Sequence, residues 1–167
     1  MAKQLLPRAL TTLIDELGNL PGVGVRTAER YAYHLLRTKA ESNKRLSNSI
    51  ANLKANVKYC PVTFALIDSD EEISPLYADP TRNKKVIAVV EEPLDIIAIE
   101  RTGQYNGTYH VLGGVISPID NIGPEQLHIK DLIIRIKQDE VEEIIIATNA
   151  SVEGESTALF LQRYIKE

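Results

Sequence analysis

The sequence of 167 residues contains one cysteine, one methionine and no tryptophan, and 5% of its residues are aromatic. With Cys60 alone, the chain cannot form an internal disulfide or build a thiolate-rich zinc site. It lacks any run of about 18 uncharged apolar residues, and the start MAKQLLPRAL lacks the apolar core of a signal peptide. These absences predict a cytoplasmic protein whose fold is held together by packing of its core.

The formal net charge of −4 conceals an uneven distribution along the chain. Residues 1–58 hold ten lysines and arginines against four acids, whereas the remaining residues hold nine against nineteen. A basic N-terminal part can neutralise phosphate groups, and an acidic C-terminal part suits a protein partner or a metal ion. The alternative is two ordinary solvated surfaces that happen to differ in charge.

Apolar periodicity predicts three helices in the N-terminal part. The first ends at Gly18, and the second spans residues 25–37 with an apolar face of five residues. The third is expected at about 41–57, with Ser42 or Asn43 as its N-terminal cap. The predicted apolar face of the second helix consists of Ala28, Tyr31, Ala32, Leu35 and Leu36.

The rest of the chain changes character twice. Residues 60–82 contain three prolines and no long apolar face, which predicts an irregular insert. Strands then alternate with helices, which favours an α/β unit with a mainly parallel sheet. We therefore predict three parts, a helical unit over residues 1–58, an insert over 59–82 and an α/β domain over 83–167. The expected strands lie at 86–90, 108–112 and 142–148, and the expected helices at 93–101, 129–138 and 153–165.

The string LPGVG, residues 20–24, joins the first two predicted helices. Glycines allow the backbone N–H groups of such a hairpin, together with the start of the next helix, to face a phosphate oxygen. Arg26 and Arg30 follow on successive turns and add positive charge. The predicted DNA-binding residues are therefore Gly22, Val23, Gly24, Arg26 and Arg30, which would contact the backbone of DNA rather than its bases. A plain helical hairpin with a glycine turn is the alternative.

Longer motifs point to one family. LPGVGVRTAER resembles a helix-hairpin-helix motif, and its continuation RYAYHLL is similar to the opening of the RecR family. Residues 89–127, which include GGVISPIDNIGPEQL, are similar to the Toprim domain of that family, and residues 147–161 resemble its closing motif. The resemblance covers nearly the whole chain.

The resemblance implies a DNA-binding recombination mediator in recombinational DNA repair, acting in the RecFOR pathway and associated with the nucleoid. Proteins of this family self-associate as dimers or tetramers into a clamp, and they work with RecO and RecF to load RecA on gapped DNA. The resemblance implies no catalytic reaction and DNA binding without sequence preference.

Toprim enzymes use a glutamate after the first strand and a DxD pair after a later one to hold a divalent metal ion. Glu91 matches the glutamate, but Asn149 and Ser151 stand at the aspartate positions, so a catalytic magnesium ion is not expected. The resemblance associates the acids of VEGE, residues 152–155, with RecO contact, and Glu91 is expected in the same cluster. The predicted partner-binding residues are therefore Glu91, Glu153 and Glu155. They are expected near the carboxyl ends of the strands, together with Glu92. Acids that merely cap the last helix are the alternative.

Two departures from the family pattern stand out. RecR proteins carry four cysteines in the insert as a zinc site, whereas Cys60 is here followed by Thr63, Ser74 and Tyr77 at the matching positions, so we predict no zinc. His110 and His128 are not expected to replace the missing ligands. The family chains also continue beyond the position of Glu167 with a segment that contributes to subunit contacts, which bears on ring closure. The insert is expected to pack through Phe64, Leu66, Ile67, Ile73, Leu76 and Tyr77.

Two other functions are compatible with parts of this pattern. One is a metal-dependent Toprim nuclease or primase-like enzyme that uses Glu91. The other is a RecO-binding remnant without DNA affinity. The missing DxD pair argues against the first, and the retained glycines and arginines of the hairpin argue against the second.

Overall fold

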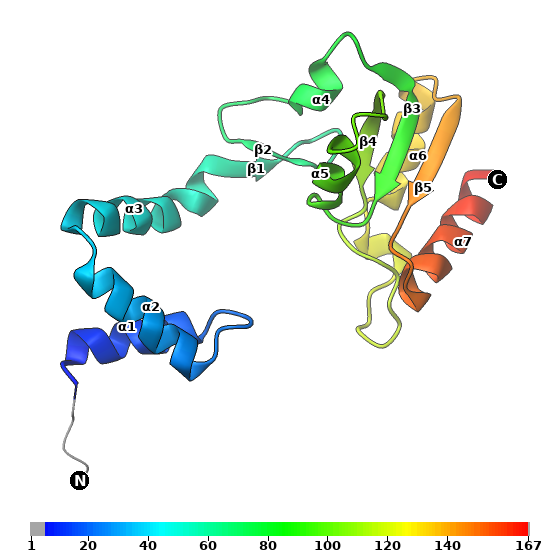
Figure 1. Cartoon of the computed structure of the whole chain (residues 1–167). Coiled ribbons are helices and arrows are strands. Elements are labelled where there is room, and N and C mark those ends of the chain that lie inside the picture. The colour runs from blue at the N-terminus through cyan, green and yellow to red at the C-terminus, as the bar shows by residue number, and fades with distance from the viewer. Residues whose placement is uncertain (1–5, 167) are drawn as a thin grey trace. The chain divides into compact units, whose positions relative to one another are not determined.

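The computed structural model describes residues 6–166, with side chains described as far as Ile165, and divides the chain into two compact units (Figure 1). The units are residues 1–53 and residues 54–167. The predicted insert of residues 59–82 lies inside the second unit rather than forming a unit of its own. Among the described residues, none of the helices is long and apolar enough to cross a membrane.

The first unit is built on two helices joined by a tight turn, α1 (Arg8–Gly18) and α2 (Val25–Arg37). Ala28 and Ala32 of α2 are fully buried, and the small residues Gly18 and Ala28 let the two helices approach closely. The predicted bounds of the second helix are confirmed. Its predicted apolar face is wrong in part, because Tyr31 and Leu36 are exposed.

The third helix, α3 (Ala40–Asn56), begins one residue before the predicted start, and neither proposed cap lies at its N-terminus. The amides of Ser42 and Asn43 instead donate to the carbonyl of Lys39, as residues inside the first turn. The side chain of Asn43 donates to the carbonyl of Leu35 at 2.8 Å. This bond ties the start of α3 to the last turn of α2, and the Leu35 carbonyl also accepts the amide of Thr38 at 3.2 Å.

The second unit contains a parallel three-stranded sheet in the order β4-β3-β5. Its strands are β3 (Asn83–Val90), β4 (Gly107–Val111) and β5 (Glu143–Ala147). The predicted α/β class and parallel sheet are confirmed. All three strands point the same way, so their carboxyl ends gather at one edge, where the loops after β3 and β5 carry Glu91 and Asn149.

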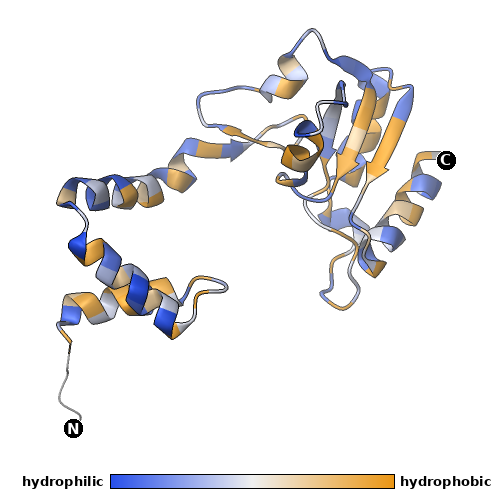
Figure 2. Ribbon diagram, viewed as in Figure 1, coloured by the Kyte–Doolittle hydropathy of each residue, from blue (hydrophilic) through white to orange (hydrophobic). Residues whose placement is uncertain are grey.

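Both faces of the sheet are covered, which explains why β3 is apolar along its second half (Figure 2). Ile87 and Val89 pack on one face with residues of α6 (Ile129–Gln138) and α7 (Val152–Lys166). Ala88 and Val90 pack on the other face with α5 (Asp95–Glu100) and with Phe64 and Leu76 of the insert. A short 3₁₀ helix, η1 (Pro124–Gln126), precedes α6.

The insert is more regular than predicted. It forms an antiparallel strand pair, β1 (Val57–Tyr59) with β2 (Leu66–Asp68), followed by a one-turn helix α4 (Pro75–Ala78). The amide of Val111 in β4 donates to the carbonyl of Thr63 at 2.9 Å, so the insert is bonded to the end of the sheet. Of the residues predicted to pack inside it, Ile67 is buried but Leu66 is exposed, because β2 turns alternate side chains outward.

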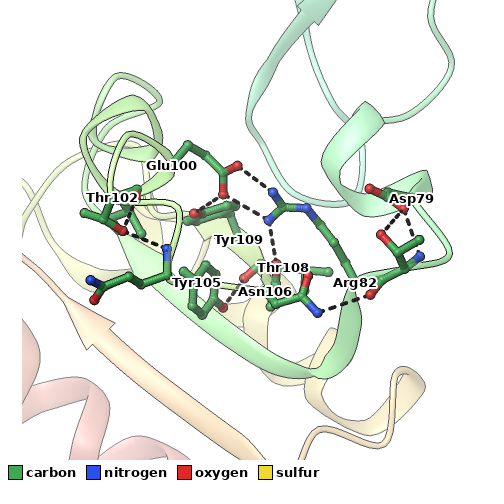
Figure 3. Close-up of polar contacts among 12 residues, drawn as sticks. Asp79, Arg82, Glu100, Thr102, Tyr105, Asn106, Thr108 and Tyr109 are labelled. Carbon is green, nitrogen blue, oxygen red and sulfur yellow. Dashed lines mark hydrogen bonds and ion pairs between the residues drawn. The ribbon is translucent and has the colours of Figure 1, made fainter.

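An ion pair fixes the chain where it enters the sheet (Figure 3). The guanidinium group of Arg82 bonds to both carboxylate oxygens of Glu100, at 3.0 and 2.5 Å, and to the carbonyl of Gly107 at 2.9 Å. The hydroxyl of Tyr109 donates to the same carboxylate at 2.5 Å. Burial raises the pKa of Glu100, but the bonds from Arg82 and Tyr109 outweigh it and hold that pKa below its usual value.

Candidate nucleic-acid and partner interfaces

The LPGVG turn forms the connection between α1 and α2. Gly22 has a φ of 78°, a left-handed conformation that favours glycine, and the amide of Val23 donates to the carbonyl of Leu20 at 3.0 Å. Gly24 directly precedes α2. A Cβ added at Gly22 or Gly24 would meet no described atom within 4 Å, so the backbone of the turn is open to a ligand.

The start of α2 has the features of an anion-binding helix end. Within residues 6–166 no side chain caps it, so its first amide groups are left to solvent or to a ligand. Arg26 and Arg30 are both exposed and lie four residues apart, on one face of the helix. The guanidinium carbon of Arg30 lies 5.6 Å from the ring centroid of Tyr31. None of the described basic residues of the first unit is in an ion pair with another described residue.

Glu91 is placed at the carboxyl end of β3 but is buried, with 7% of its surface exposed. Its Oε1 atom accepts a hydrogen bond from the backbone amide of Asn149 at 2.8 Å, and its Oε2 atom accepts one from the side chain of Asn149 at 2.6 Å. A Cβ added at Gly154 would lie 2.2 Å from the carbonyl oxygen of Asn149 and 2.8 Å from Oε1 of Glu91. Glycine at this position therefore allows α7 to start against the Glu91 carboxylate.

These contacts do not fit the divalent metal ion of Toprim enzymes. Both oxygens of Glu91 accept hydrogen bonds from amide groups of Asn149, where a metal site would need a second carboxylate. The hydroxyl of Ser151 accepts the amide of Gly154 at 3.0 Å, as a helix cap does. In the described part of the chain, no three histidine, cysteine, aspartate or glutamate residues are grouped so that they could hold a metal ion.

The predicted partner-binding acids fall in different environments. Glu153 and Glu155 lie in the first turn of α7, where Glu155 is exposed and Glu153 is half-buried. Both carboxylates are well placed against the positive end of the α7 dipole. Glu92 is exposed, unlike its neighbour Glu91. The structure thus places Glu91 beneath the start of α7, with Glu153 and Glu155 on that helix.

The positions that match the four zinc-binding cysteines of the resembled family, where we predicted no zinc, hold no zinc-binding donor set. The Sγ atom of Cys60 accepts hydrogen bonds from the amides of Thr63 at 3.4 Å and Ser74 at 3.2 Å, and all three residues are buried. The hydroxyl of Tyr77 donates to Asp139 at 2.9 Å, which connects α4 to the end of α6. One thiol, two aliphatic hydroxyls and a phenol already bonded elsewhere do not make a zinc site.

A cluster of three rings was missed at the sequence level. Phe64 stacks on His128 with ring centroids 3.6 Å apart, and it meets His110 edge-on at 5.5 Å. His110 is fully buried, and its Nε2 atom lies 2.7 Å from the carbonyl oxygen of His128. The residues come from the insert, from β4 and from the position before α6, and no local pattern in the sequence links them.

Comparison with known proteins decides which family these units belong to. Residues 10–54 match the family described as RecR, helix-hairpin-helix, and residues 85–167 match the Toprim domain. Recombination protein RecR of Moorella thermoacetica is 48% identical over 160 residues, which cover 96% of this chain and 79% of that protein. The chain belongs to the RecR family. The protein of the same name from Deinococcus radiodurans is 44% identical over 160 residues, covering 96% of this chain and 71% of that protein.

Membership of the RecR family confirms the resemblance that the sequence motifs predicted. The helix-hairpin-helix match contains the LPGVG turn and both arginines of α2. The Toprim match contains Glu91, Asn149 and the VEGE acids. The features described above therefore lie in the parts of this RecR-family chain that carry the family likeness.

Proposed function

We propose that this chain is a non-catalytic, DNA-binding subunit in recombinational DNA repair. Its relatives from Moorella and Deinococcus are named recombination proteins. The observation that carries the proposal is the glycine turn before α2, with its uncapped helix start and the exposed Arg26 and Arg30. Backbone amides and guanidinium groups together suit phosphate oxygens, because the helix dipole and the charges act in the same direction.

The proposed contact reads the backbone of DNA and carries no sequence information. Gly22, Val23 and Gly24 supply open backbone, and the arginines supply charge. Binding of this kind depends steeply on salt, because each neutralised phosphate releases counterions. We propose single-stranded, gapped or duplex DNA as the ligand, bound on the nucleoid in the cytoplasm.

Self-association into a dimer or tetramer is part of the proposal, and the apolar surface of the first unit supports it. A groove of about 440 Å³ has Leu13, Leu17, Leu35, Leu46 and Ile50 among the residues that line it. Ile50 and Leu53 are 67% and 62% exposed, which is costly for apolar side chains left in water. A second copy that covers this groove would produce the subunit contact of a clamp.

RecO and RecF are the proposed protein partners, in loading RecA on gapped DNA. Glu155, together with the half-buried Glu153, gives the start of α7 a negative surface that suits a basic partner. Glu91 has a different role in this proposal, because both oxygens of its buried carboxylate already accept hydrogen bonds from Asn149. We propose that Glu91 positions the loop before α7 and contacts no partner.

A metal-dependent nuclease or primase-like activity is the less favoured function. The Glu91 carboxylate accepts two hydrogen bonds from Asn149, so the residues present supply neither the charge nor the free oxygens that magnesium requires. The insert likewise lacks a zinc donor set. We propose that the chain acts without a metal ion or other cofactor.

The test is DNA affinity measured by fluorescence anisotropy across a salt series, with single-stranded and gapped DNA. The variant carries Arg26→Gln with Arg30→Gln, and the control carries Arg101→Gln with Arg163→Gln, which removes two exposed arginines from the second unit. Loss of two phosphate contacts should lower the salt slope by about 1.5 to 2 and the affinity by roughly tenfold or more. If the Arg26 and Arg30 variant binds like the control, the hairpin is not the DNA contact, whereas no DNA binding by the unchanged chain would favour the partner-binding remnant.

A further inference from the structure

A cleft of about 550 Å³ lies in the second unit, between the insert and the carboxyl ends of β3 and β4. Its lining includes Tyr59 and Phe64 of the insert, Glu92 after β3, Gly113 after β4, and His128. The volume falls in the range of small-ligand sites. In the strand order β4-β3-β5, this cleft lies on the β4 side of β3, whereas Glu153 and Glu155 follow β5 on the other side. It is therefore a different surface from the proposed partner contact at α7.

The wall of the cleft contains a bulky residue in an unfavourable backbone conformation. Phe64 has a φ of 58°, a region that residues with large side chains rarely adopt. This conformation brings its ring parallel to that of His128, with an interplanar angle of 7° and ring centroids 3.6 Å apart. Strain of this kind persists where surrounding contacts enforce it, and it concentrates at functional sites.

Behind this wall, His110 holds the ring pair in place. Its Nε2 atom lies 2.7 Å from the carbonyl oxygen of His128, which can only accept, so Nε2 carries a proton and donates this bond. Its Nδ1 atom is buried without a hydrogen-bond partner among the described residues. The edge of Phe64 lies against the His110 ring. The stacked rings of Phe64 and His128 are therefore both in contact with His110, which is fixed in strand β4.

Glu92 adds a negative charge that the described residues leave uncompensated. Its side chain is exposed, and within residues 6–166 it belongs to none of the ion pairs. Its backbone amide donates to Asp95 at 2.8 Å, which fixes the loop that carries it. Tyr59, 65% exposed, adds a free aromatic ring to the same cleft.

We propose that this cleft binds the guanidinium group of an arginine that a protein partner presents. A planar cation is attracted by the faces of aromatic rings and forms paired hydrogen bonds with a carboxylate, so it matches both kinds of lining. The second unit is acidic overall and attracts a basic partner. The same charge repels the phosphates of a nucleic acid, which makes a nucleobase the poorer occupant.

The experiment uses the full chain and NMR spectroscopy at pH 7.5. The probe is the peptide acetyl-Gly-Arg-Gly-amide, and the comparison probes are the same peptide with citrulline, which has the arginine shape without its charge, and thymidine monophosphate. The signals followed are the ring protons of His128 and the amide of Gly113. We expect the arginine peptide to shift these signals and the citrulline peptide to bind at least tenfold more weakly.

Two variants test the assignment of the cleft. Glu92→Gln should weaken binding of the arginine peptide about tenfold, and Tyr59→Ala should weaken it severalfold. Glu143→Gln, which removes the same charge at the opposite end of the sheet, should leave it unchanged. Equal binding of the arginine and citrulline peptides, no effect of Glu92→Gln, or larger shifts with thymidine monophosphate would each overturn the proposal. None of these results depends on whether the LPGVG hairpin binds DNA.

Discussion

Asn149 donates one hydrogen bond to each carboxylate oxygen of Glu91, from its backbone amide at 2.8 Å and from its side chain at 2.6 Å. The two residues lie at the ends of β3 and β5, where a Toprim enzyme has acidic metal ligands. An amide thus takes the place that a cation would have beside Glu91. Because Asn149 is neutral where a Toprim enzyme has an aspartate, no second carboxylate faces Glu91 and no metal ion is needed to balance it. The two hydrogen bonds instead fix the loop before α7.

This relationship predicts the behaviour of Asn149→Asp. The new carboxylate would lie against Glu91, and two such groups are costly to ionise together, so the free energy of unfolding at pH 7 should fall by about 1–3 kcal/mol. Millimolar magnesium should recover part of this loss, while leaving the unchanged chain unaffected. Urea unfolding followed by amide signals of the second unit measures both effects, with Gln162→Glu on α7 as the control. Stabilisation of the unchanged chain by magnesium would show that the native site binds metal.

The insert should be independent of zinc. Cys60 accepts two backbone amides, and Thr63 and Ser74 are buried beside it, so the protein contacts already fill the place of a metal. Thermal unfolding should be the same with and without a strong chelator, and elemental analysis of the purified protein should find less than one zinc per ten chains. A lower midpoint of unfolding in the chelator would contradict this account of the insert.

Tyr77 should carry much of the attachment of the insert to the α/β domain. Its hydroxyl bonds to Asp139, which also pairs with the buried Arg135 at 3.0 Å, and the guanidinium carbon of Arg135 lies 4.9 Å from the Tyr77 ring centroid. Tyr77→Phe keeps the ring and removes one hydrogen bond to a charged group, so it should cost about 1–2 kcal/mol of unfolding free energy. Tyr33→Phe, an exposed site in the first unit, is the control. A loss no larger than the control's would place the attachment elsewhere.

Arg82→Lys should destabilise the second unit by about 1–3 kcal/mol at pH 7, because lysine cannot reproduce the paired bonds to Glu100. The pKa of Glu100 is lowered in the fold, so the stability from this pair is present above the unfolded pKa of a glutamate and is lost as the pH falls through the folded pKa. The difference between variant and unchanged chain should therefore shrink in acid. Urea unfolding at several pH values measures it, with Arg101→Lys as control. A difference that persists at pH 2 would exclude the ion pair as its origin.

His110 should make the fold sensitive to mild acid. Burial lowers the pKa of its ring from 6.5 to about 4, so the unfolded chain takes up a proton before the folded one does. Stability should be unaffected above pH 6.5 and should decrease between pH 6.5 and 4 by roughly 3 kcal/mol. His110→Gln, which does not titrate but can still donate to the His128 carbonyl, should remove that part of the pH dependence. The same acid slope in both proteins would exclude His110 as its source.

Much of the fold was predictable from local patterns. The helix at residues 25–37 matched its prediction because Gly24 and Thr38, at its two ends, have extended backbones. The apolar run at 86–90 predicted a strand, and these residues form the second half of β3. The hairpin and the VEGE acids could also be located from the family motifs. Each is a contiguous stretch of sequence whose spacing is set by one turn or one helix.

Features that depend on contacts between distant residues were not predictable. Glu91 was predicted to be a partner-binding residue, but it is buried against Gly154 and Asn149, about 60 residues further along the chain. The caps assigned to α3 failed because Asn43 bonds back to α2 instead. The Phe64, His110 and His128 cluster requires the insert to fold onto β4, which no apolar period in the insert indicates.

We propose that this RecR-family chain assembles and holds DNA through charge rather than through sequence. Sedimentation equilibrium over a concentration series, alone and with gapped DNA at low and moderate salt, tests it most directly. We predict a dimer or tetramer that binds the DNA at low salt and loses affinity steeply as the salt concentration rises. A monomer that sediments independently of the DNA at both salt concentrations would contradict the claim.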